Sequence, residues 1–409
     1  MSRKIKATRM PLGLYISVPF CRTKCSYCNF ASDVFSKTAY ENYIARVLED
    51  IGNSRRAATE LGCIFDEAAD SIYLGGGTPS ILDPAQLVRI FDALREYFKI
   101  AADAEITVEC APGTLSAGLI ETLQGCGVNR VSLGVQSFVD QEAAAVGRLH
   151  KRATVLEEID RLRKAGLDNI NIDLIAGLPH QTAESWTFSL EETIATGAPH
   201  VSVYMLEVDD DSRLGRELIA GGTRYHAHFV PDDEATADFY LQACGALNSA
   251  GIAQYEISNF ARAGRESRHN LKYWTRQPYL GFGVDAHSML PVNGGDHRRA
   301  VRFATPDSLD AYMNRQPNGV TPVSEEAALE ESFFLGLRLN RGVNLERLGV
   351  DFGPTSLAGS ERVIQECVGE GLLERQGASV RLTSRGRLLS NEVFARFLGE
   401  EGAVGTRSA

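Results

Sequence analysis

Short apolar runs alternate with amphipathic stretches along the first half of the chain. Runs dense in Val, Ile and Leu are typical of parallel strands covered on both faces, and they fall at 14–18, 70–74, 104–109, 129–135, 168–175 and 199–206. Stretches with apolar residues at helical spacing lie between them, at 37–53, 84–98, 114–125, 151–165 and 182–196. This alternation predicts an α/β fold with a parallel sheet and right-handed crossovers. An active site then belongs at the carboxyl ends of the strands, whether the sheet is flat or curved into a barrel.

The pattern loosens after residue 206. A helix is expected near 233–249, followed by a segment from 253 to 303 that is rich in aromatic residues, Gly and Asn, and by a linker near 321–326. Beyond the linker the pattern predicts helices at 326–339, 356–368 and 384–398, and short strands at 371–375 and 379–383 with Gly377 between them. We therefore expect a main domain over 1–320, a mainly helical, winged-helix-like accessory domain over 321–400, and a disordered tail over 401–409.

Composition and charge narrow the class of protein. Of 409 residues, 44% are hydrophobic and 23% charged, which is typical of a globular protein. No apolar run approaches the roughly 18 residues of a membrane span. The basic start, with Arg3, Lys4, Lys6 and Arg9, leads into the first strand without a small-residue cleavage site, so we expect a cytoplasmic protein. The net charge of −11 argues against a general nucleic-acid binder.

Three cysteines follow the first strand with the spacing Cys-x-x-x-Cys-x-x-Cys, at Cys21, Cys25 and Cys28. Three thiolates can hold three corners of a 4Fe–4S cluster and leave the fourth iron open to a small molecule, whereas electron carriers and structural zinc sites normally use four ligands. Three unrelated thiols, or a zinc site that borrows a distant His, are the alternatives. The scattered Cys63, Cys110, Cys126, Cys244 and Cys367 are interpreted as buried free thiols.

Glycine and polar residues follow the next strands. Gly75, Gly76 and Gly77 precede Thr78 after the second strand, where backbone without side chains can approach a ligand closely, although a tight turn would explain them equally. Glu109 ends the third strand, Gln136 the fourth, Arg148 follows in GRLH, and Asp173 lies in the fifth. Each alone could be a satisfied structural group, but an unpaired buried carboxylate is costly. Together they predict a polar mouth at one edge of the sheet.

The cysteine spacing and its surroundings resemble the radical S-adenosylmethionine (SAM) superfamily. The resemblance implies an open six-stranded partial TIM barrel and a 4Fe–4S cluster on Cys21, Cys25 and Cys28. It also implies an electron donor such as flavodoxin or ferredoxin. By match to one branch, the SAM-binding residues would be Tyr15, Tyr27, Gly76, Gly77, Thr78, Glu109, Gln136, Arg148 and Asp173. One departure is the run Cys-Ala-Pro after Glu109, where relatives often have Asn before the Pro, and it does not touch the carboxylate.

The run His269-Asn-Leu-Lys-Tyr273-Trp274 is the remaining candidate site. Neutral imidazole is a common heme ligand, but a His beside aromatic residues is also a frequent structural group. The run resembles the signature of a heme chaperone branch related to oxygen-independent coproporphyrinogen III dehydrogenase. The resemblance implies heme held by His269 with Tyr273 and Trp274 against the porphyrin, transfer to acceptor proteins such as membrane respiratory enzymes, and possible dimerisation. His287, in GFGVDAHSM, is the second candidate ligand.

Two departures separate this chain from the dehydrogenase. That enzyme carries a further cysteine two residues after the third ligand, where this chain has Phe30, and it has a longer extension than the twenty residues before Cys21. The resulting hypothesis is a heme chaperone. Oxygen-independent coproporphyrinogen III dehydrogenase is the alternative, followed by a radical enzyme acting on an unrelated substrate. Whether the chain turns over any substrate is left open by the sequence.

Overall fold

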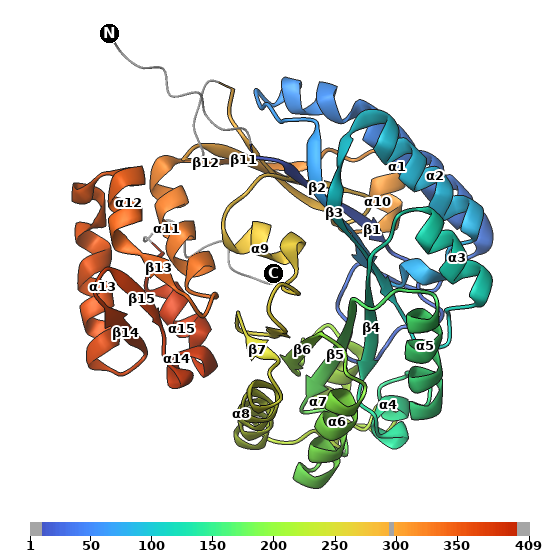
Figure 1. The fold of residues 1–409 in the computed structure, drawn as a ribbon. Coiled ribbons are helices and arrows are strands. Elements are labelled where there is room, and N and C mark those ends of the chain that lie inside the picture. Colours follow the sequence, from blue (N-terminus) through green and yellow to red (C-terminus); the bar gives the residue numbers. More distant parts are fainter. Residues whose placement is uncertain (1–9, 294–297, 399–409) are drawn as a thin grey trace.

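The computed structural model describes residues 10–293 and 298–398, so the basic start and the tail at 401–409 lie outside the described residues (Figure 1). Six parallel strands form the centre of an open, curved sheet, as predicted. They are β1 (Leu12–Val18), β2 (Ala68–Gly76), β3 (Lys99–Cys110), β4 (Arg130–Gln136), β5 (Ile170–Ala176) and β6 (His200–Met205). The largest difference is in β3, which begins at Lys99 rather than at 104.

Helices cover the outer face of this sheet (Figure 1). The predicted ones are present as α1 (Lys37–Glu60), α2 (Pro84–Tyr97), α3 (Ala117–Gly125), α5 (Arg152–Lys164), α6 (Ala183–Ala195) and α8 (Asp233–Ser249). Shorter elements join them: η1 (Pro79–Ile81), α4 (Asp140–Ala145), α7 (Arg213–Ala220) and η2 (Ala227–Phe229). In α2, Asp83 and Gln86 form a capping box at the N-terminus. The same helix buries Leu87, Ile90 and Leu94 completely against its neighbours, as its spacing predicted.

The sheet is longer than the six strands predicted. Among the described residues it has twelve strands, in the order β12-β11-β10-β9-β1-β2-β3-β4-β5-β6-β8-β7. The additional strands are β7 (Ala253–Gln254), β8 (Asn259–Ala261), β9 (Tyr279–Phe282), β10 (His287–Pro291), β11 (Ala300–Ala304) and β12 (Gly319–Val323). The first part of the expected linker at 321–326 is therefore wrong, because residues 321–323 pair with β11. Pairing across a sheet, rather than local pattern, holds these short strands.

Helix α9 (Arg268–Trp274) closes the sheet interior at the amino ends of the first strands. The backbone N–H groups of Arg268 and His269 donate to the Glu105 carboxylate at 3.1 and 3.2 Å. The Lys272 ammonium lies 2.6 Å from the Asp70 carboxylate and donates to the Pro11 carbonyl at 2.9 Å. A charged network from one short helix thus seals the end of the barrel opposite the strand carboxyl ends.

A mainly helical unit follows the sheet and has its own apolar core, which includes Phe333, Ile364 and Val380 (Figure 1). Its elements are α11 (Glu325–Gly336), β13 (Val343–Asn344), α12 (Leu345–Phe352), η3 (Pro354–Leu357), α13 (Ala358–Gly369), β14 (Leu373–Gln376), β15 (Ser379–Leu382), α14 (Ser384–Leu388) and α15 (Ser390–Ala395), preceded by α10 (Leu309–Met313). Helices and a small sheet agree with the winged-helix-like expectation. The exact boundary at 320/321 stays a prediction.

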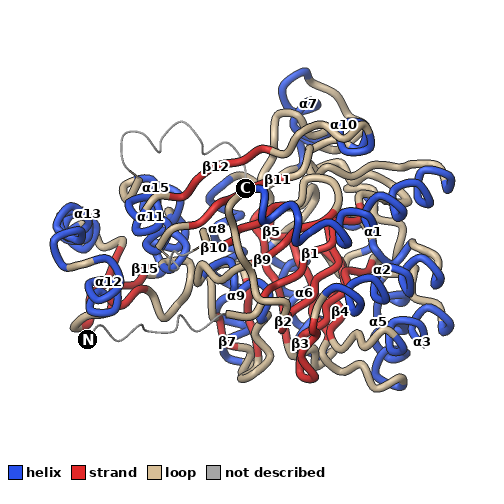
Figure 2. Tube along the Cα trace, turned by 90° about the horizontal axis from the view of Figure 1, so that it is seen from above, coloured by secondary structure: helices blue, strands red, loops and turns tan. Residues whose placement is uncertain are grey.

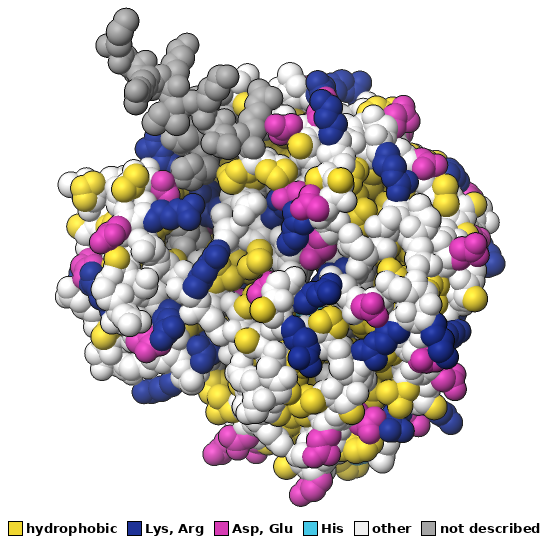
Figure 3. All heavy atoms as spheres, viewed as in Figure 1, with side chains coloured by type: hydrophobic (Ala, Val, Ile, Leu, Met, Phe, Trp, Pro, Cys, Tyr) yellow, Lys and Arg dark blue, Asp and Glu magenta, His cyan; other side chains and the backbone are white. Residues whose placement is uncertain are grey.

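The surface and the long axis of the molecule add two observations. On the face drawn in Figure 3, acidic and basic side chains are interspersed, in keeping with the charge argument against a nucleic-acid binder. Seen from above in Figure 2, α7 stands out at one edge of the barrel, while α13 lies at the far end of the helical unit. Within residues 10–293 and 298–398 we find no helix with the length and apolar character that crossing a bilayer requires.

Tyr43 offers a test of how α1 is fastened to the sheet. Its buried hydroxyl donates to the Ser17 carbonyl at 2.7 Å and accepts from the Val284 N–H at 3.1 Å. We expect Tyr43→Phe to lower the free energy of unfolding by about 1–3 kcal/mol, because both backbone groups are left unpaired. Urea unfolding followed by circular dichroism measures this. The exposed Tyr97→Phe is the control, expected to change stability by less than about 0.5 kcal/mol, and equal stabilities would contradict the assignment.

Candidate functional site

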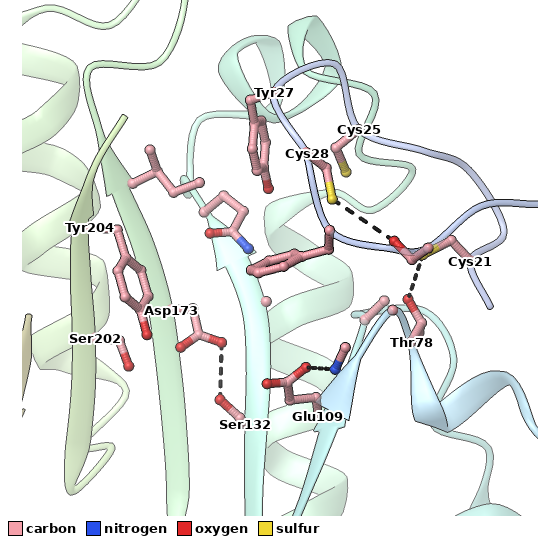
Figure 4. Close-up of a pocket in the computed structure, with 18 of the residues that line it drawn as sticks. Cys21, Cys25, Tyr27, Cys28, Thr78, Glu109, Ser132, Asp173, Ser202 and Tyr204 are labelled. Atoms are coloured by element: carbon pink, nitrogen blue, oxygen red, sulfur yellow. Dashed lines mark hydrogen bonds between the residues drawn. The ribbon is translucent and has the colours of Figure 1, made fainter. Parts of the chain in front are cut away.

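A cavity of about 340 Å³ opens at the carboxyl ends of the central strands. Its lining brings together all the predicted cluster and SAM residues except one: Cys21, Cys25, Tyr27, Cys28, Gly76, Gly77, Thr78, Glu109, Gln136, Arg148 and Asp173. The exception is Tyr15, which is not among the described lining residues and packs its ring on Tyr73 with centroids 6.2 Å apart. Figure 4 shows the cysteines on a loop above the strand ends, with Glu109 and Asp173 directed at the same space from below.

The cysteine loop leaves β1 and returns to it. The Cys21 N–H donates to the Asp33 carbonyl and the Asp33 N–H to the Pro19 carbonyl, each at 3.0 Å, so the loop is closed at its base. Inside it, the Lys24 ammonium donates to the Ser32 carbonyl at 2.8 Å. The Thr78 hydroxyl lies 3.8 Å from the Cys21 sulfur. A loop fixed at its base in this way holds three thiols on one side of the cavity.

The three thiols are free, and burial raises the pKa of Cys21 and Cys28. Within the described residues, no three His, Cys, Asp or Glu side chains are placed to ligate a single metal ion. A cubane cluster does not need three ligands around a single ion, because each of its cysteines binds a different iron. None of the described residues that line the cavity is a histidine, so a zinc site completed by His finds no ligand there.

The glycines after β2 are required by close packing. A Cβ on Gly77 would lie 2.7 Å from the carbonyl oxygens of both Val18 and Phe20. The Gly77 N–H donates to Val18, and the Thr78 N–H to Phe20, each at 2.8 Å. Gly76 has a φ of +100°, a conformation that side chains disfavour. The end of β2 therefore lies directly against the start of the cysteine loop and presents bare backbone to the cavity.

Two carboxylates and two guanidinium groups share the interior of the sheet. Tyr73 donates to Glu109 at 2.7 Å, and the Gly76 N–H donates to it at 3.2 Å. Burial raises the pKa of Glu109 from 4.5 to about 7, and burial also raises the pKa of Asp173. Arg130, which is 2% exposed, and Arg148 supply the opposite charge. The cavity thus has an ionic interior in which one carboxyl titrates near neutral pH.

A row of small polar side chains crosses the sheet and was not foreseen. Asn171 on β5 donates to Asp173 at 2.7 Å, to Ser132 on β4 at 2.7 Å and to Ser202 on β6 at 3.0 Å. Ser202 donates to Asn259 on β8 at 2.8 Å. All of them line the cavity. Polar residues at every second position, such as Asn171 and Asp173, indicate a strand with one polar face. This signal is missed when the strands are interpreted as apolar on both faces.

The predicted heme residues lie mostly behind the cavity rather than in it. His269 is 1% exposed, with Nδ1 3.0 Å from the Ser71 hydroxyl and Nε2 2.8 Å from the Tyr273 hydroxyl. Burial lowers the pKa of His269 to about 3, so the ring is neutral. The Arg338 guanidinium covers the Trp274 ring, 4.3 Å from its centroid. From this run only Asn270, which the sequence analysis did not select, lines the cavity.

The second candidate ligand is placed differently. The His287 side chain is 69% exposed at the start of β10, and its Nε2 lies 3.7 Å from the Asp285 carboxylate. It is not among the described residues that line the cavity. The structure therefore brings the predicted cluster residues and all the predicted SAM residues except Tyr15 into one cavity, but neither predicted heme ligand is among the described residues that line it.

The cavity fits the amino acid part of SAM and a cluster beside it. The Nε atoms of Arg130 and Arg148 are buried without a hydrogen-bond partner, and both side chains line the cavity. A carboxylate is the natural partner for such atoms. Glu109 and Asp173 match a cationic group, and the bare edge at Gly76 and Gly77 leaves room for a ligand to approach the backbone. Three thiols complete this arrangement at the mouth.

Comparisons with known proteins agree with this site. Residues 15–192 match the model of the radical SAM superfamily, and residues 323–389 match that of the HemN C-terminal domain. In its fold the chain is similar to coproporphyrinogen III oxidase (HemN) from Escherichia coli, with a TM-score of 0.79 and 23% identity over 95% of this chain and 90% of that chain. This likeness concerns the fold alone.

Curated relatives extend the match over the whole length. The chain is 34% identical to the heme chaperone HemW of Bacillus subtilis (strain 168), which covers 94% of this chain and 99% of the relative. It is 32% identical to the heme chaperone HemW of Escherichia coli (strain K12), over 95% of this chain and 99% of the relative. On this similarity the chain belongs to the radical SAM superfamily and, within it, to the family of the HemW heme chaperones.

Proposed function

We propose that this protein is a heme chaperone that carries a 4Fe–4S cluster and SAM, binds heme and passes it to acceptor proteins in the cytoplasm or at respiratory membranes. The observation that carries the proposal is the cavity at the strand ends, where three thiols, bare glycine backbone and charged side chains of both signs meet. Full-length similarity to the HemW chaperones supports it. The acceptor itself, and any dimer, are further proposals from the same resemblance.

The residues of the cavity have separate roles in this proposal. Cys21, Cys25 and Cys28 bind the cluster, which when bound and reduced supplies one electron to the sulfonium of SAM. Arg148 is held by Tyr27, whose hydroxyl it contacts at 3.1 Å, and its Nε has no hydrogen-bond partner among the described residues, so this guanidinium would pair with the ligand carboxylate. The backbone at Gly76 and the Glu109 carboxylate hold the amino acid end. Gln136, Thr78 and Asp173 complete the pocket, and flavodoxin or ferredoxin is the proposed electron donor.

His269 stays the predicted heme ligand from the resemblance, with Tyr273 and Trp274 beside the porphyrin. The structure sets a condition for this role. Both ring nitrogens of His269 are engaged, and Arg338 occupies one face of Trp274. For His269 to bind iron, α9 would have to move, and the hydrogen bond between the His269 ring and Ser71 or Tyr273 would have to break.

The alternative is a coproporphyrinogen III dehydrogenase, which the likeness in fold to HemN makes the second candidate. The position where that enzyme carries its additional cysteine is Phe30, whose side chain is 63% exposed at the cavity rim. A phenyl ring can neither ligate iron nor transfer a proton. The chaperone is therefore the better-supported function.

The proposal is tested by an anaerobic heme titration of the cluster-loaded protein, recorded as difference absorbance against the same protein without heme. We expect saturable binding with one heme per chain. The same preparation, given reductant, SAM and coproporphyrinogen, is expected to form no vinyl product. Absence of saturable binding together with vinyl formation would establish the dehydrogenase instead.

Cluster ligation is tested by Cys25→Ala. We expect this variant to lose most of its iron and acid-labile sulfide after anaerobic reconstitution, because two thiolates do not hold a cubane. Cys63→Ala, which removes a buried thiol outside the cavity, is the matched control and should keep both. Iron and sulfide assays measure the outcome, and full content in the Cys25 variant would refute the assignment.

Glu109 gives a pH dependence in the protein prepared without cluster and SAM. Because burial raises the pKa of Glu109 from 4.5 to about 7, the folded state binds this proton more tightly than the unfolded chain does. The resulting stability is complete below the unfolded pKa and is lost as the pH rises through the folded one. We expect Glu109→Gln to remove this part of the decline in melting temperature between about pH 5 and 8. The exposed Glu96→Gln should melt like wild type, and a parallel decline in the Glu109 variant would exclude the effect.

A further inference from the structure

Histidines that can reach a heme are few in this structure. Seven of the eight lie in the described part of the chain, and three of these are buried: His150, His200 and His269. His150 Nε2 bonds to the Val135 carbonyl at 3.1 Å, and the two ring nitrogens of His200 are engaged by Asn171 and Tyr255. The accessible ones are His180, His226, His228 and His287. Three of those four lie together.

These three form what we call the histidine cluster: His180, His226 and His228, packed around Phe229. His180 Nε2 lies 3.2 Å from His226 Nδ1, so the two rings are directly bonded. The ring centroids of His180 and His228 lie 4.1 and 4.3 Å from that of Phe229. His228 is exposed, and its imidazole has no hydrogen-bond partner among the described residues. The exposed His228 imidazole thus lies beside the Phe229 ring, against which His180 also packs.

The fold holds the histidine cluster just beyond the carboxyl end of β5, on the side of the sheet where the cavity opens. His180 follows the carboxyl end of β5, and its N–H donates to the Phe229 carbonyl at 3.0 Å. From the other side, the Glu217 carboxylate accepts from the N–H groups of Tyr225 and Ala227 at 2.9 and 3.2 Å. His180 and His226 both have left-handed backbone, with φ of 69° and 61°. Such conformations are disfavoured for residues other than glycine and persist where the surroundings enforce them.

Large apolar side chains are exposed on the same pair of elements. Leu218 and Ile219 at the end of α7 are 55% and 68% exposed, and Phe229 in η2 is 48% exposed. The two elements pack on each other, and α7 stands out at the edge of the barrel (Figure 2). An accessible imidazole with the exposed Phe229 ring beside it, and further exposed apolar groups on the helix packed against η2, suit a porphyrin ring and its iron. Burial and the neighbouring His226 lower the pKa of His180, which favours its neutral ring.

We infer that the histidine cluster is a docking site for heme, with His228 as the iron ligand and Phe229, Leu218 and Ile219 against the porphyrin. The inference rests on the proposed function, to which it adds the place where heme first binds. His269, the heme ligand predicted from the sequence, is enclosed in this structure. The histidine cluster needs no movement of α9 and adjoins the cavity, since Leu178 beside His180 packs with Tyr27 and Leu206.

Heme suits the histidine cluster better than a bare metal ion does. His180 and His226 together offer two nitrogens, and no group of three metal-ligating side chains around one ion is found among the described residues. A bare transition-metal ion normally takes three or four protein ligands. A porphyrin already supplies four nitrogens to its iron, so that one or two from the protein complete the coordination. An exposed single imidazole is therefore sufficient.

The test is the anaerobic heme titration repeated on full-length, cluster-loaded variants. We expect the triple variant His180→Ala/His226→Ala/His228→Ala to bind heme about tenfold or more weakly than wild type. Phe188→Ala, which removes an exposed aromatic side chain outside the cluster, is the control and should bind heme like wild type. His287→Ala is titrated separately as the second candidate ligand. His269→Ala is titrated beside them. Melting temperature and iron content show that each variant is folded and loaded.

A second variant shows whether the ligand is His228 itself. His228→Gly is expected to lose the absorbance spectrum of imidazole-ligated heme and to regain it when free imidazole is added. Wild-type heme affinity in the triple variant would overturn the inference. If the triple variant lost Ni²⁺ binding but kept heme binding, the histidine cluster would be a bare-cation site, and the inference would also fail. Failure of wild type to bind heme would instead refute the proposed function. If His269→Ala alone lost heme binding and the triple variant kept it, the heme site would lie at His269, behind the cavity.

Discussion

Charge enclosed within an apolar sheet is the constraint on which this structure depends. Glu109, Arg130 and Asp173 stand on strands of one parallel sheet, and Arg148 joins them from the loop between α4 and α5, in an interior where a lone ion would be strongly destabilising. They are tolerated because each faces an opposite charge or a hydrogen-bond donor. Tyr73 and the Gly76 N–H donate hydrogen bonds to Glu109, and Ser132 and Asn171 donate hydrogen bonds to Asp173. The cavity is thus a polar chamber held together by its own pairing, with unpaired Nε atoms left for a ligand.

The opposite end of the sheet depends on α9. Its N–H groups bind the Glu105 carboxylate, and Lys272 binds Asp70, so that the barrel interior is closed on that side. At its far end, Trp274 lies under Arg338 of the helical unit, and Arg276 pairs with Glu331 of α11 at 2.7 Å. The run that resembles a heme signature therefore also joins two parts of the protein. A heme ligand within it could act only with a change in that junction.

Parallel strands explain why the chemistry gathers on one side. Every loop that follows a central strand emerges at the same edge of the sheet, so the cysteine loop after β1, the glycines at the end of β2 and His180 after β5 all lie on that side. A chaperone that takes up heme near its SAM cavity would need such an arrangement. Exposed side chains such as Leu218 and Ile219 are tolerated on this side on a rigid scaffold.

The sequence alone predicted the six central strands, the main helices between them and eleven residues that line the cavity, because these depend on local period and on motifs carried by strand ends. Tertiary structure decided the rest. The strands at 253–261 and 279–323 are too short for a local pattern and exist by pairing with β6 and β1. The polar row through Asn171 and Ser202 joins residues far apart in the chain. The environment of His269 was set by packing, since only the folded chain places Ser71 and Tyr273 on its two nitrogens, and likewise only folding brings His180 to His226.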